Sequence, residues 1–197
     1  MENKQYLIAE ARREQIIKAA VEVLREVGYV STSLSKIANK ANISTGLISY
    51  HFSGKEDLMN NTLMYLVQQE WGFIKEKVEQ KQTPTEKLMA FIEASLAYQV
   101  TNRVNNIALI EIVFNARTPD NVPYYLIEDN DEDLLNDLLQ EILDKGQESK
   151  EFSDFHPQVI ATVIRGAISE SMLSSQHELT LEEYSEKLTK AILKMVK

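Results

Sequence analysis

Apolar residues recur along most of this chain at spacings of three and four, which is the period of an amphipathic α-helix. The first such stretch covers residues 7–27, and Gly28 is expected to end it in the left-handed C-cap conformation. Thr32 or Ser33 can act as the N-cap of a second, short helix over residues 34–41. The pattern therefore predicts two consecutive helices at the start of the chain.

A tight turn follows the second helix. Asn42 tolerates a positive φ, Ile43 is expected to enter the core, and Ser44 can cap a third short helix. Two short helices joined by such a turn are typical of a helix-turn-helix motif.

The rest of the chain repeats the helical period. Lys55-Glu56-Asp57 opens a long helix, because acidic groups in the first turn suit the helix dipole. Further helices are expected from Thr83-Pro84, over the apolar stretch 107–114, from Tyr124 to Lys145 with Gly146 as its end, after Pro157, and after the cap Thr180, while residues 119–123 form a loop.

Composition supports helices over strands. The chain has 197 residues with only six glycines and four prolines, so we expect an all-α protein of about nine helices. It contains no cysteine, no signal-peptide pattern near its start and no apolar run of membrane-spanning length. We therefore expect a soluble, cytoplasmic protein without a membrane partner.

The net charge of −9 is unevenly distributed along the chain. Residues 1–55 carry eight Lys and Arg against five Glu, whereas residues 56–197 carry 13 basic against 25 acidic residues. Attraction to phosphate depends on the local field rather than on the total. The first quarter can therefore bind nucleic acid although the whole chain is acidic.

The third short helix has the features of a DNA-reading helix. Its cap Ser44 leaves backbone N–H groups free for phosphate. Thr45, Gly46 and Ser49 are small enough to let the helix approach the floor of a major groove. Leu47 can meet a thymine methyl group.

Longer side chains flank these small residues. Tyr50, His51 and Lys55 are donors that can grip the DNA backbone, although an exposed tyrosine or a lone histidine often has no such role. Arg12, Arg13 and Lys18 near the start of the first helix either form a solvated face or make loose phosphate contacts.

The spaced motifs of residues 10–60 resemble the N-terminal signature of the TetR family of bacterial repressors. The matching residues are Gly28-Tyr29, Thr32-Ser33, Ile37-Ala38, Ile43-Ser44, Gly46, Ile48, Tyr50-His51-Phe52 and Lys55-Glu56-Asp57-Leu58. Two positions depart from the pattern, because Asn42 stands where the family usually has glycine and Lys150 where a second glycine often follows Gly146.

The resemblance implies double-stranded operator DNA as a partner and assigns roles in its binding. Phosphate contacts would come from Thr32, Ser33, Ser44, Tyr50, His51 and Lys55. Base edges would be faced by Ser35, Thr45, Gly46, Leu47 and Ser49, while Ile37, Ala38, Ile48 and Phe52 would pack the helices together. Residues 1–54 would form a three-helix DNA-binding domain, and residues 55–197 a larger helical domain for ligand sensing and dimerisation.

A homodimer is expected, because one short helix reads few base pairs and operator selectivity usually requires two such helices. The C-terminal apolar stripes can form a four-helix interface. Its candidate residues are Ile160, Val163, Ile164, Ala167, Ile168, Tyr184, Leu188 and Ile192. The alternative is that these stripes fill the subunit's own core.

The resemblance also implies a small-molecule effector that binds a cavity in the C-terminal helices. The candidate wall residues are Trp71, Phe91, Tyr98, Ile110, Phe114 and Met172, which suit a mainly apolar or aromatic ligand. Aromatic residues at helical spacing are more often ordinary core. The effector would favour a conformation in which the paired reading helices no longer fit adjacent grooves, and so release a repressor from its operator.

Other functions have less support. The chain has no nucleophile elbow, His-Glu-x-x-His helix or phosphate-binding glycine loop, so we expect no catalytic residues, metal site or cofactor. The acidic run 128–133 lacks the glycine of a calcium loop and is expected to be a solvated helix start. The alternatives to a ligand-controlled regulator are a helical protein-interaction module and an architectural DNA binder.

Overall fold

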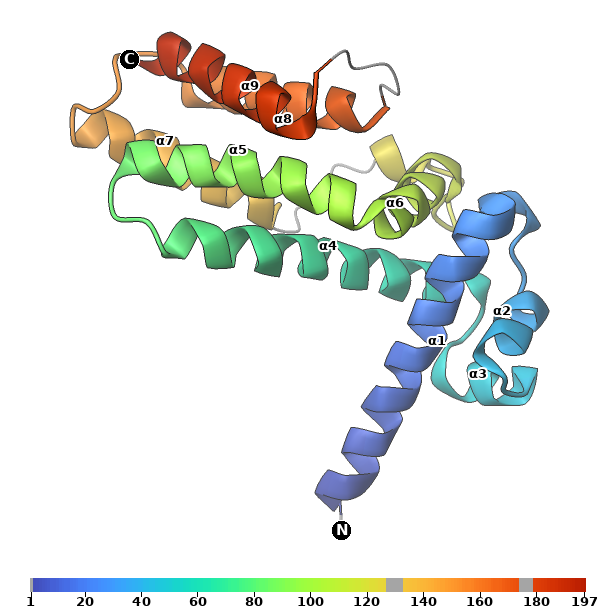
Figure 1. Cartoon of the computed structure of the whole chain (residues 1–197). Helices are drawn as coiled ribbons and strands as arrows, with labels where there is room; N and C mark the ends of the chain where they lie inside the picture. Colours follow the sequence, from blue (N-terminus) through green and yellow to red (C-terminus); the bar gives the residue numbers. More distant parts are fainter. Residues whose placement is uncertain (1, 127–132, 174–178) are drawn as a thin grey trace. The chain divides into compact units, whose positions relative to one another are not determined.

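The structure, a computed structural model, describes residues 2–126, 133–173 and 179–197, without the side chains of residues 2–5, 172 and 173. These ranges form nine α-helices and one short 3-10 helix, with an isolated bridge between Arg117 and Pro123 as their only strand-like pairing. The predicted all-α fold is confirmed for this part of the chain (Figure 1). The helices are α1 Glu2–Ser31, α2 Leu34–Ala41, α3 Thr45–His51, α4 Lys55–Glu79, α5 Pro84–Thr101, α6 Arg103–Asn115, η1 Tyr124–Leu126, α7 Leu134–Glu148, α8 Pro157–Leu173 and α9 Leu181–Val196.

The chain divides into two compact units. Unit 1 consists of Met1–Gln68 and Arg103–Glu128, and unit 2 of Gln69–Asn102 and Asp129–Lys197. α4 contributes to both units, and α6 belongs to unit 1 although it comes late in the chain. The predicted boundary after residue 54 separates a DNA-binding function from ligand sensing and dimerisation. The two compact units do not test it, so it stays a prediction.

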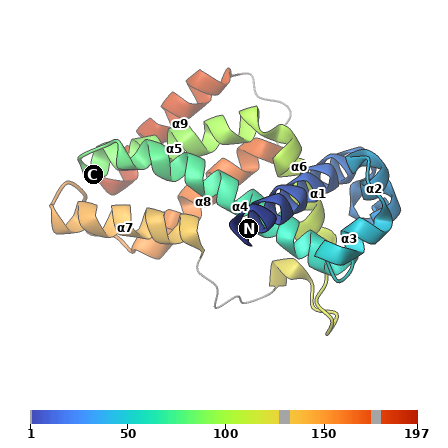
Figure 2. The same ribbon diagram turned by 90° about the horizontal axis from the view of Figure 1, so that it is seen from below.

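Unit 1 is organised around α1, which packs against α2 on one side and α6 on the other. Figure 2 shows α2 and α3 beside α1. Ile16, Ala20 and Leu24 are completely buried in α1, as expected from their helical spacing. Burial of this stripe fixes the helix-turn-helix segment against α1.

Gly28 interrupts the helical geometry of α1, with φ 72° and ψ 171°. The positive φ is as predicted, but the predicted left-handed C-cap is wrong, because ψ differs from that conformation and the helix continues beyond Gly28. This region of φ and ψ is open almost only to glycine. The chain therefore bends here, and three more residues of helical turn lead to Ser31.

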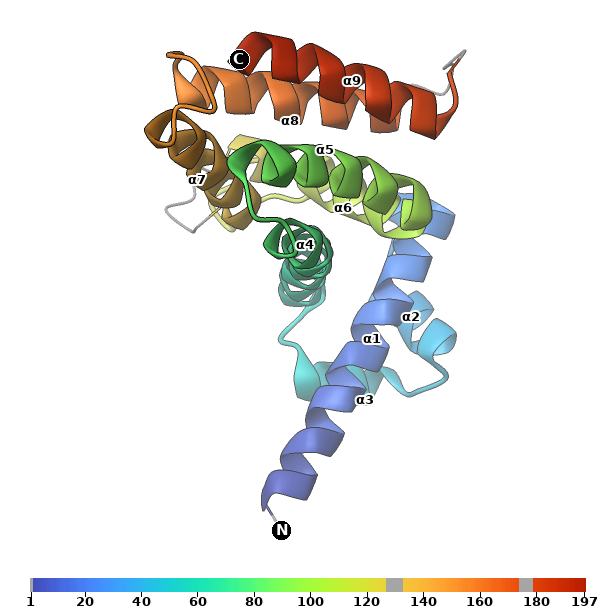
Figure 3. The same ribbon diagram turned by 60° about the vertical axis from the view of Figure 1, so that its left-hand side comes forward.

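In unit 2, α5 packs against α7, α8 and α9. Figure 3 shows α8 and α9 side by side. The core includes Leu88 and Ile92 of α5, Leu139 of α7 and Ile164 of α8, each completely buried. Burial of these side chains holds α5, α7 and α8 together.

The predicted starts of α5 and α9 are confirmed. The hydroxyls of Thr83 and Thr180 accept from the backbone N–H of Glu86 and Glu183, whose carboxylates accept from the cap residues in return. Each helix therefore begins with a complete capping box, which satisfies N–H groups that the helix itself cannot pair.

The predicted helix from Tyr124 to Lys145 is wrong at both ends. The structure has the 3-10 turn η1 and, after the undescribed residues 127–132, helix α7 with Asp133 as its N-cap. The expected helix start within the acidic run therefore lies outside the described residues except for Asp133. Asp133 determines where α7 begins, because its carboxylate accepts from the backbone N–H of Asn136.

Gly146 does not end α7, which continues to Glu148. This glycine is buried because the ring of Phe152 packs onto it, and a Cβ built on Gly146 would lie 2.0 Å from Cδ2 of Phe152. The residue after the helix that adopts a positive φ is Lys150, at 61°. The sequence pattern thus located the right segment but ended the helix too early, at Gly146 instead of after Glu148.

Among the described residues, no helix combines the length and the apolar character that crossing a membrane requires.

Candidate nucleic-acid interface

The helix-turn-helix prediction is confirmed in its local geometry. The Ser33 hydroxyl caps α2 and accepts from the N–H of Lys36 at 3.3 Å, while the Ser44 hydroxyl caps α3 and accepts from the N–H of Leu47 at 3.2 Å. Asn42 lies between them with φ 54° and ψ 49°, the left-handed conformation that the sequence required of it. The turn therefore needs no glycine at this position, because asparagine adopts this conformation at low cost.

The inner side of the motif is apolar and buried. Ile37 and Ile48 are completely inaccessible, and Ala38 and Phe52 are each 2% exposed. These are the four residues expected to pack the helices together. Their burial fixes which side of α3 faces away from the protein.

The outer side of α3 is polar and exposed. Tyr50 is 81% exposed, and Leu47 and His51 are half-buried. The other exposed residues of this set are Ser33, Ser35, Ser44, Thr45, Gly46 and Ser49. The structure therefore brings nine of the eleven predicted DNA-binding residues onto the accessible surface of α2, α3 and their caps, while their contacts with DNA stay a prediction.

Thr32 is the first exception. It is only 4% exposed, and its hydroxyl donates to the carbonyl of Gly28 at 2.7 Å. A buried hydroxyl that is already engaged is poorly available to a phosphate. We therefore leave Thr32 out of the set of proposed DNA contacts and assign it to the turn between α1 and α2.

Lys55 is the second exception, because its ammonium is held by the protein. Nζ donates to the carbonyl of Tyr29 at 2.7 Å and lies 4.4 Å from the centroid of the Tyr29 ring. Burial lowers the pKa of Lys55, although the nearby Glu56 opposes this shift. Its phosphate contact stays a prediction, and in the structure Lys55 ties the start of α4 to the end of α1.

Arg13 is a positioning residue that the sequence pattern did not reveal. Its guanidinium donates to the carbonyl of His51 at 2.7 Å and to Oδ1 of Asn61 at 2.8 Å, and it lies 4.5 Å from the centroid of the Phe52 ring. Arg13 thus braces the C-terminal end of α3 and is neither a solvated nor a loose group. Its place one helical turn before Ile17 was the available signal, since it puts Arg13 on the buried side of α1.

A second brace reaches the turn of the motif from α1. Nε2 of Gln15 donates to the carbonyl of Ala41, the last residue of α2, at 2.9 Å. Together with Arg13, it attaches both helices of the motif to α1. The exposed side of α3 is therefore held in place by contacts of both α2 and α3 with α1.

Two lysines near the motif already have partners within the protein. Lys40 pairs with Glu26 at 2.5 Å, and Nζ of Lys36 donates to the carbonyl of Ser31 at 2.7 Å. The hydrogen bond from Lys40 lowers the pKa of Glu26. Both lysines are exposed, so a phosphate can compete for them.

The six predicted effector-wall residues do not form one group. Phe91 and Tyr98 are almost completely buried in unit 2, and Trp71 of the same unit is half-buried. Ile110 is half-buried and Phe114 is 62% exposed, both in unit 1. The side chain of Met172 lies outside the described residues. The ordinary-core alternative therefore holds for Phe91 and Tyr98.

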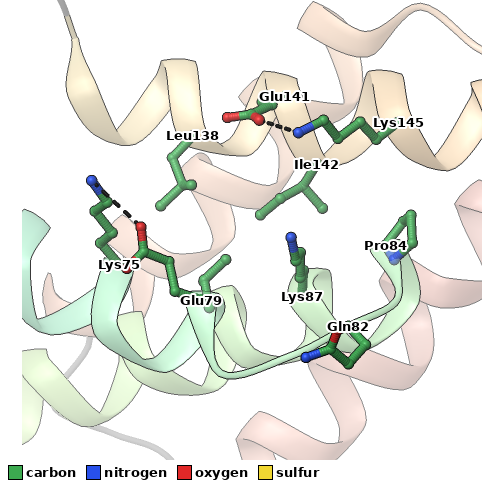
Figure 4. Close-up of a pocket in the computed structure, with 10 residues that line it drawn as sticks. Lys75, Glu79, Gln82, Pro84, Lys87, Leu138, Glu141, Ile142 and Lys145 are labelled. Atoms are coloured by element: carbon green, nitrogen blue, oxygen red, sulfur yellow. Dashed lines mark hydrogen bonds and ion pairs between the residues drawn. The ribbon is translucent and has the colours of Figure 1, made fainter.

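A cavity of about 290 Å³ lies in unit 2 between α4, α5 and α7, and it includes none of those six residues. Val78, Leu138 and Ile142 give it an apolar floor. Its polar lining comprises Lys75, Glu79, Gln82, Lys87, Glu141 and Lys145 (Figure 4). Lys75 pairs with Glu79 at 3.5 Å and Lys145 pairs with Glu141, whereas Lys87 forms no ion pair among the described residues.

The eight predicted dimer residues fall into two groups. Ile160, Ile164, Ile168 and Ile192 are at most 7% exposed and fill the core of unit 2, so the own-core alternative holds for them. Val163 is 39% exposed, and Ala167, Tyr184 and Leu188 are half-buried. Val159, Leu181 and Met195 add further exposed apolar area on the same two helices, α8 and α9.

Comparison with known proteins gives matches in sequence and in structure. Residues 16–62 match the family model of bacterial regulatory proteins of the tetR family. The HTH-type transcriptional regulator BetI of Burkholderia cenocepacia is 32% identical over 87 residues, which are 44% of this chain and 45% of that protein. The alignment thus spans less than half the length of the curated relatives that the chain matches.

Solved structures match over nearly the whole chain. The transcriptional regulator FadR from Bacillus subtilis, in complex with stearoyl-CoA, has a TM-score of 0.74 and 23% identity, covering 93% of this chain and 99% of that one. The ketosteroid transcriptional regulator KstR2 of Mycobacterium tuberculosis has a TM-score of 0.68 and 19% identity, covering 94% and 95%. At these identities the similarity establishes the fold.

Proposed function

Because this chain belongs to the TetR family of bacterial regulatory proteins, we propose that it is a homodimeric, sequence-specific DNA-binding regulator of transcription. The observation that carries the proposal is α3, whose exposed side is polar and whose buried side is anchored through Ile48 and Phe52. Arg13 and Gln15 hold the motif from α1. A rigid helix with an accessible polar side is what reading a major groove requires.

The side chains on α3 divide into two roles. Thr45, Gly46 and Ser49 are small, so the helix can approach base edges closely and read DNA shape as well as hydrogen-bonding groups. Ser44 and Tyr50 lie at opposite ends of the helix and are suited to the phosphates on either side of the groove. No arginine lies on α3, so direct reading of guanine by a bidentate contact is not expected.

Selection of bound sequences from random duplexes tests the proposal. A specific regulator should enrich one site of two-fold symmetry, bind it about 10³-fold or more tightly than random DNA, and lose affinity steeply with salt. Binding without this margin would instead support an architectural DNA binder. No binding to any duplex would support a protein-interaction module.

Substitutions on α3 test the assignment of residues. Tyr50→Ala should weaken binding to all duplexes, whereas Thr45→Ala should change the preference at one base position. Tyr125→Ala is a matched control, because Tyr125 is also exposed but lies in η1. A folded Tyr50→Ala protein that binds its selected site as tightly as the unchanged chain would contradict the assignment.

We further propose that the effector has an apolar body and an anionic group. The cavity between α4, α5 and α7 combines an apolar floor with three lysines and two glutamates, and Lys87 is the lysine that forms no ion pair among the described residues, although its charge acts on Glu141. The FadR structure contains stearoyl-CoA, a ligand with this combination, and KstR2 is named for ketosteroids, which are largely apolar. An acyl-CoA and a ketosteroid both have an apolar body, and the lysines favour the acyl-CoA because it also carries anionic groups.

Calorimetric titration with stearoyl-CoA and with a neutral ketosteroid distinguishes the two ligand classes. Lys87→Ala should weaken binding of the anionic probe about tenfold, because one charge-assisted contact is lost. Lys81→Ala is the control, since Lys81 is exposed on the neighbouring loop and does not line the cavity. Equal binding of the anionic probe by both variants would rule out this cavity as its site.

The proposed mode of control is repression that the effector relieves. The effector would bind more tightly to a conformation in which the two α3 helices of a dimer are wrongly spaced for adjacent grooves. A bound effector should then lower the affinity for the selected site. If no ligand of unit 2 changes that affinity, this mode of control fails while DNA binding itself stands.

A further inference from the structure

The backbone of Tyr29 is held at its N–H and at its carbonyl by charged side chains of two other helices. Its N–H donates to Oε2 of Glu111 in α6 at 2.8 Å, and its carbonyl accepts from Nζ of Lys55 in α4 at 2.7 Å. All three residues belong to unit 1, where the end of α1 lies beside α6 (Figures 1 and 3). Glu111 and Lys55 come from parts of the chain far from Tyr29, so this contact depends on the fold.

The carboxylate of Glu111 occupies the space that Gly28 leaves open. A Cβ built on Gly28 would lie 3.2 Å from Oε2 of Glu111, closer than most carbon–oxygen contacts. Asn115 adds support, because its side-chain amide donates to the carbonyl of Glu111 at 3.0 Å. Glu111 forms no ion pair among the described residues, and its Oε2 accepts from the N–H of Tyr29 at 2.8 Å and more weakly from the side-chain amide of Asn115 at 3.5 Å.

Tyr29 begins the turn that leads into the helix-turn-helix motif. The N–H of Thr32 donates to the carbonyl of Tyr29 at 3.2 Å, and the Thr32 hydroxyl donates to the carbonyl of Gly28 at 2.7 Å. Ser33, the next residue, caps α2. A change in the position of the Tyr29 backbone would therefore change where α2 starts.

We infer that Glu111 is a positioning residue for DNA reading. It holds the N–H of Tyr29, and through the backbone of this residue it fixes both the start of α2 and the ammonium of Lys55 in the arrangement that presents α3. This role rests on the proposed function, in which α3 reads DNA. A displacement of α6 by about 1 Å would stretch a 2.8 Å hydrogen bond beyond its effective range, so α6 and the motif are coupled at this contact.

Three variants test this role in the full-length protein. Glu111→Ala removes the acceptor and Glu111→Gln keeps an acceptor oxygen without the charge, while Glu93→Ala removes a charge from an exposed position of α5 that has no hydrogen bond or ion pair among the described residues. The affinity of each for the selected duplex and for random duplex is measured together with its thermal midpoint.

Glu111→Ala should bind the selected duplex about tenfold more weakly, because a charge-assisted hydrogen bond is lost. Its affinity for random duplex should stay within about twofold, because that binding depends on phosphate charge. Glu111→Gln should recover most of the loss. Equal affinities of Glu111→Ala and Glu93→Ala for the selected duplex would overturn the inference, as would parallel losses on selected and random duplex.

Amide hydrogen exchange gives a readout that does not depend on DNA. The N–H of Tyr29 should exchange faster in Glu111→Ala than in the unchanged protein and Glu111→Gln, while amides of α5 keep their rates. If selection yields no duplex at all, the proposed function fails and this measurement still tests the contact. An unchanged exchange rate for the N–H of Tyr29 in Glu111→Ala would overturn the inference, whether or not the selection yields a duplex.

Discussion

Gly146 and Gly72 are both glycines inside helices, but their surroundings differ. Gly146 of α7 is covered by the ring of Phe152, so any Cβ would overlap it. Gly72 of α4 is exposed, and nothing lies within 4 Å of the Cβ that alanine would add. The same substitution should therefore have opposite effects at the two positions.

Gly146→Ala should lower the free energy of unfolding by about 1–3 kcal/mol, because the added methyl forces Phe152 out of its place. Gly72→Ala should raise it by up to about 1 kcal/mol, because alanine is the better helix former and meets no obstacle. Urea unfolding of both variants measures the difference. A gain of stability in Gly146→Ala would show that Phe152 can move at little cost.

Glu70 of α4 makes stability depend on pH. Burial raises the pKa of its carboxyl above the ordinary value of 4.5, a shift opposed by Arg165 and assisted by Asp133. The folded state therefore keeps a proton that the unfolded state has lost, so this group's contribution to stability falls as the pH rises from 4.5 through the raised pKa.

Glu70→Gln removes this titration and should be more stable than the unchanged chain at about pH 7.5, with the difference shrinking toward about pH 4. Urea unfolding at the two pH values measures it. If the variant were instead less stable at the higher pH, the attraction between Glu70 and Arg165 would outweigh the cost of burial.

At the scale of elements, α3 is too short to be stable alone and depends on its braces. Arg13→Ala should lower the free energy of unfolding by about 1–3 kcal/mol, because it leaves the carbonyl of His51 and the amide of Asn61 without their charged donor. It should also weaken binding to the selected duplex. Lys18→Ala on the same helix is the control, since its exposed pair with Glu14 is worth less than about 1 kcal/mol. Equal effects of the two substitutions would mean that Arg13 is only a surface charge.

The elements also show how far local sequence signals reach. The caps Ser33, Ser44, Thr83 and Thr180 were all predicted, because a cap acts on a backbone N–H only two or three residues away. The start of α7 was not, because several acidic residues precede it that could each act as a cap, and the sequence prediction began the helix at Tyr124 instead of after Asp133. Periodicity shows which side of a helix is apolar and says little about where the helix begins.

At the scale of the whole molecule, the proposed dimer depends on the apolar side chains that α8 and α9 leave exposed. Val163→Glu places a charge among them and should convert the dimer to monomer, because an unpaired charge is costly to bury. Sedimentation velocity measures the state, and the selected duplex should then bind more weakly. Val100→Glu is the matched control on α5, where the valine is 60% exposed. A Val163→Glu protein that remains dimeric would place the interface elsewhere.

The amino-acid sequence by itself determined the all-α class, the helix-turn-helix with Asn42 in its turn, and the polar side of α3. Each depends on residues within one or two helical turns, so spacing and cap chemistry suffice to predict them. Only the tertiary structure decided the rest. Arg13 meets His51 across 38 residues and Tyr29 meets Glu111 across 82, and four isoleucines expected at a dimer interface fill the subunit's own core. An apolar stripe must be buried, but the surface that buries it is chosen by the packing of distant helices.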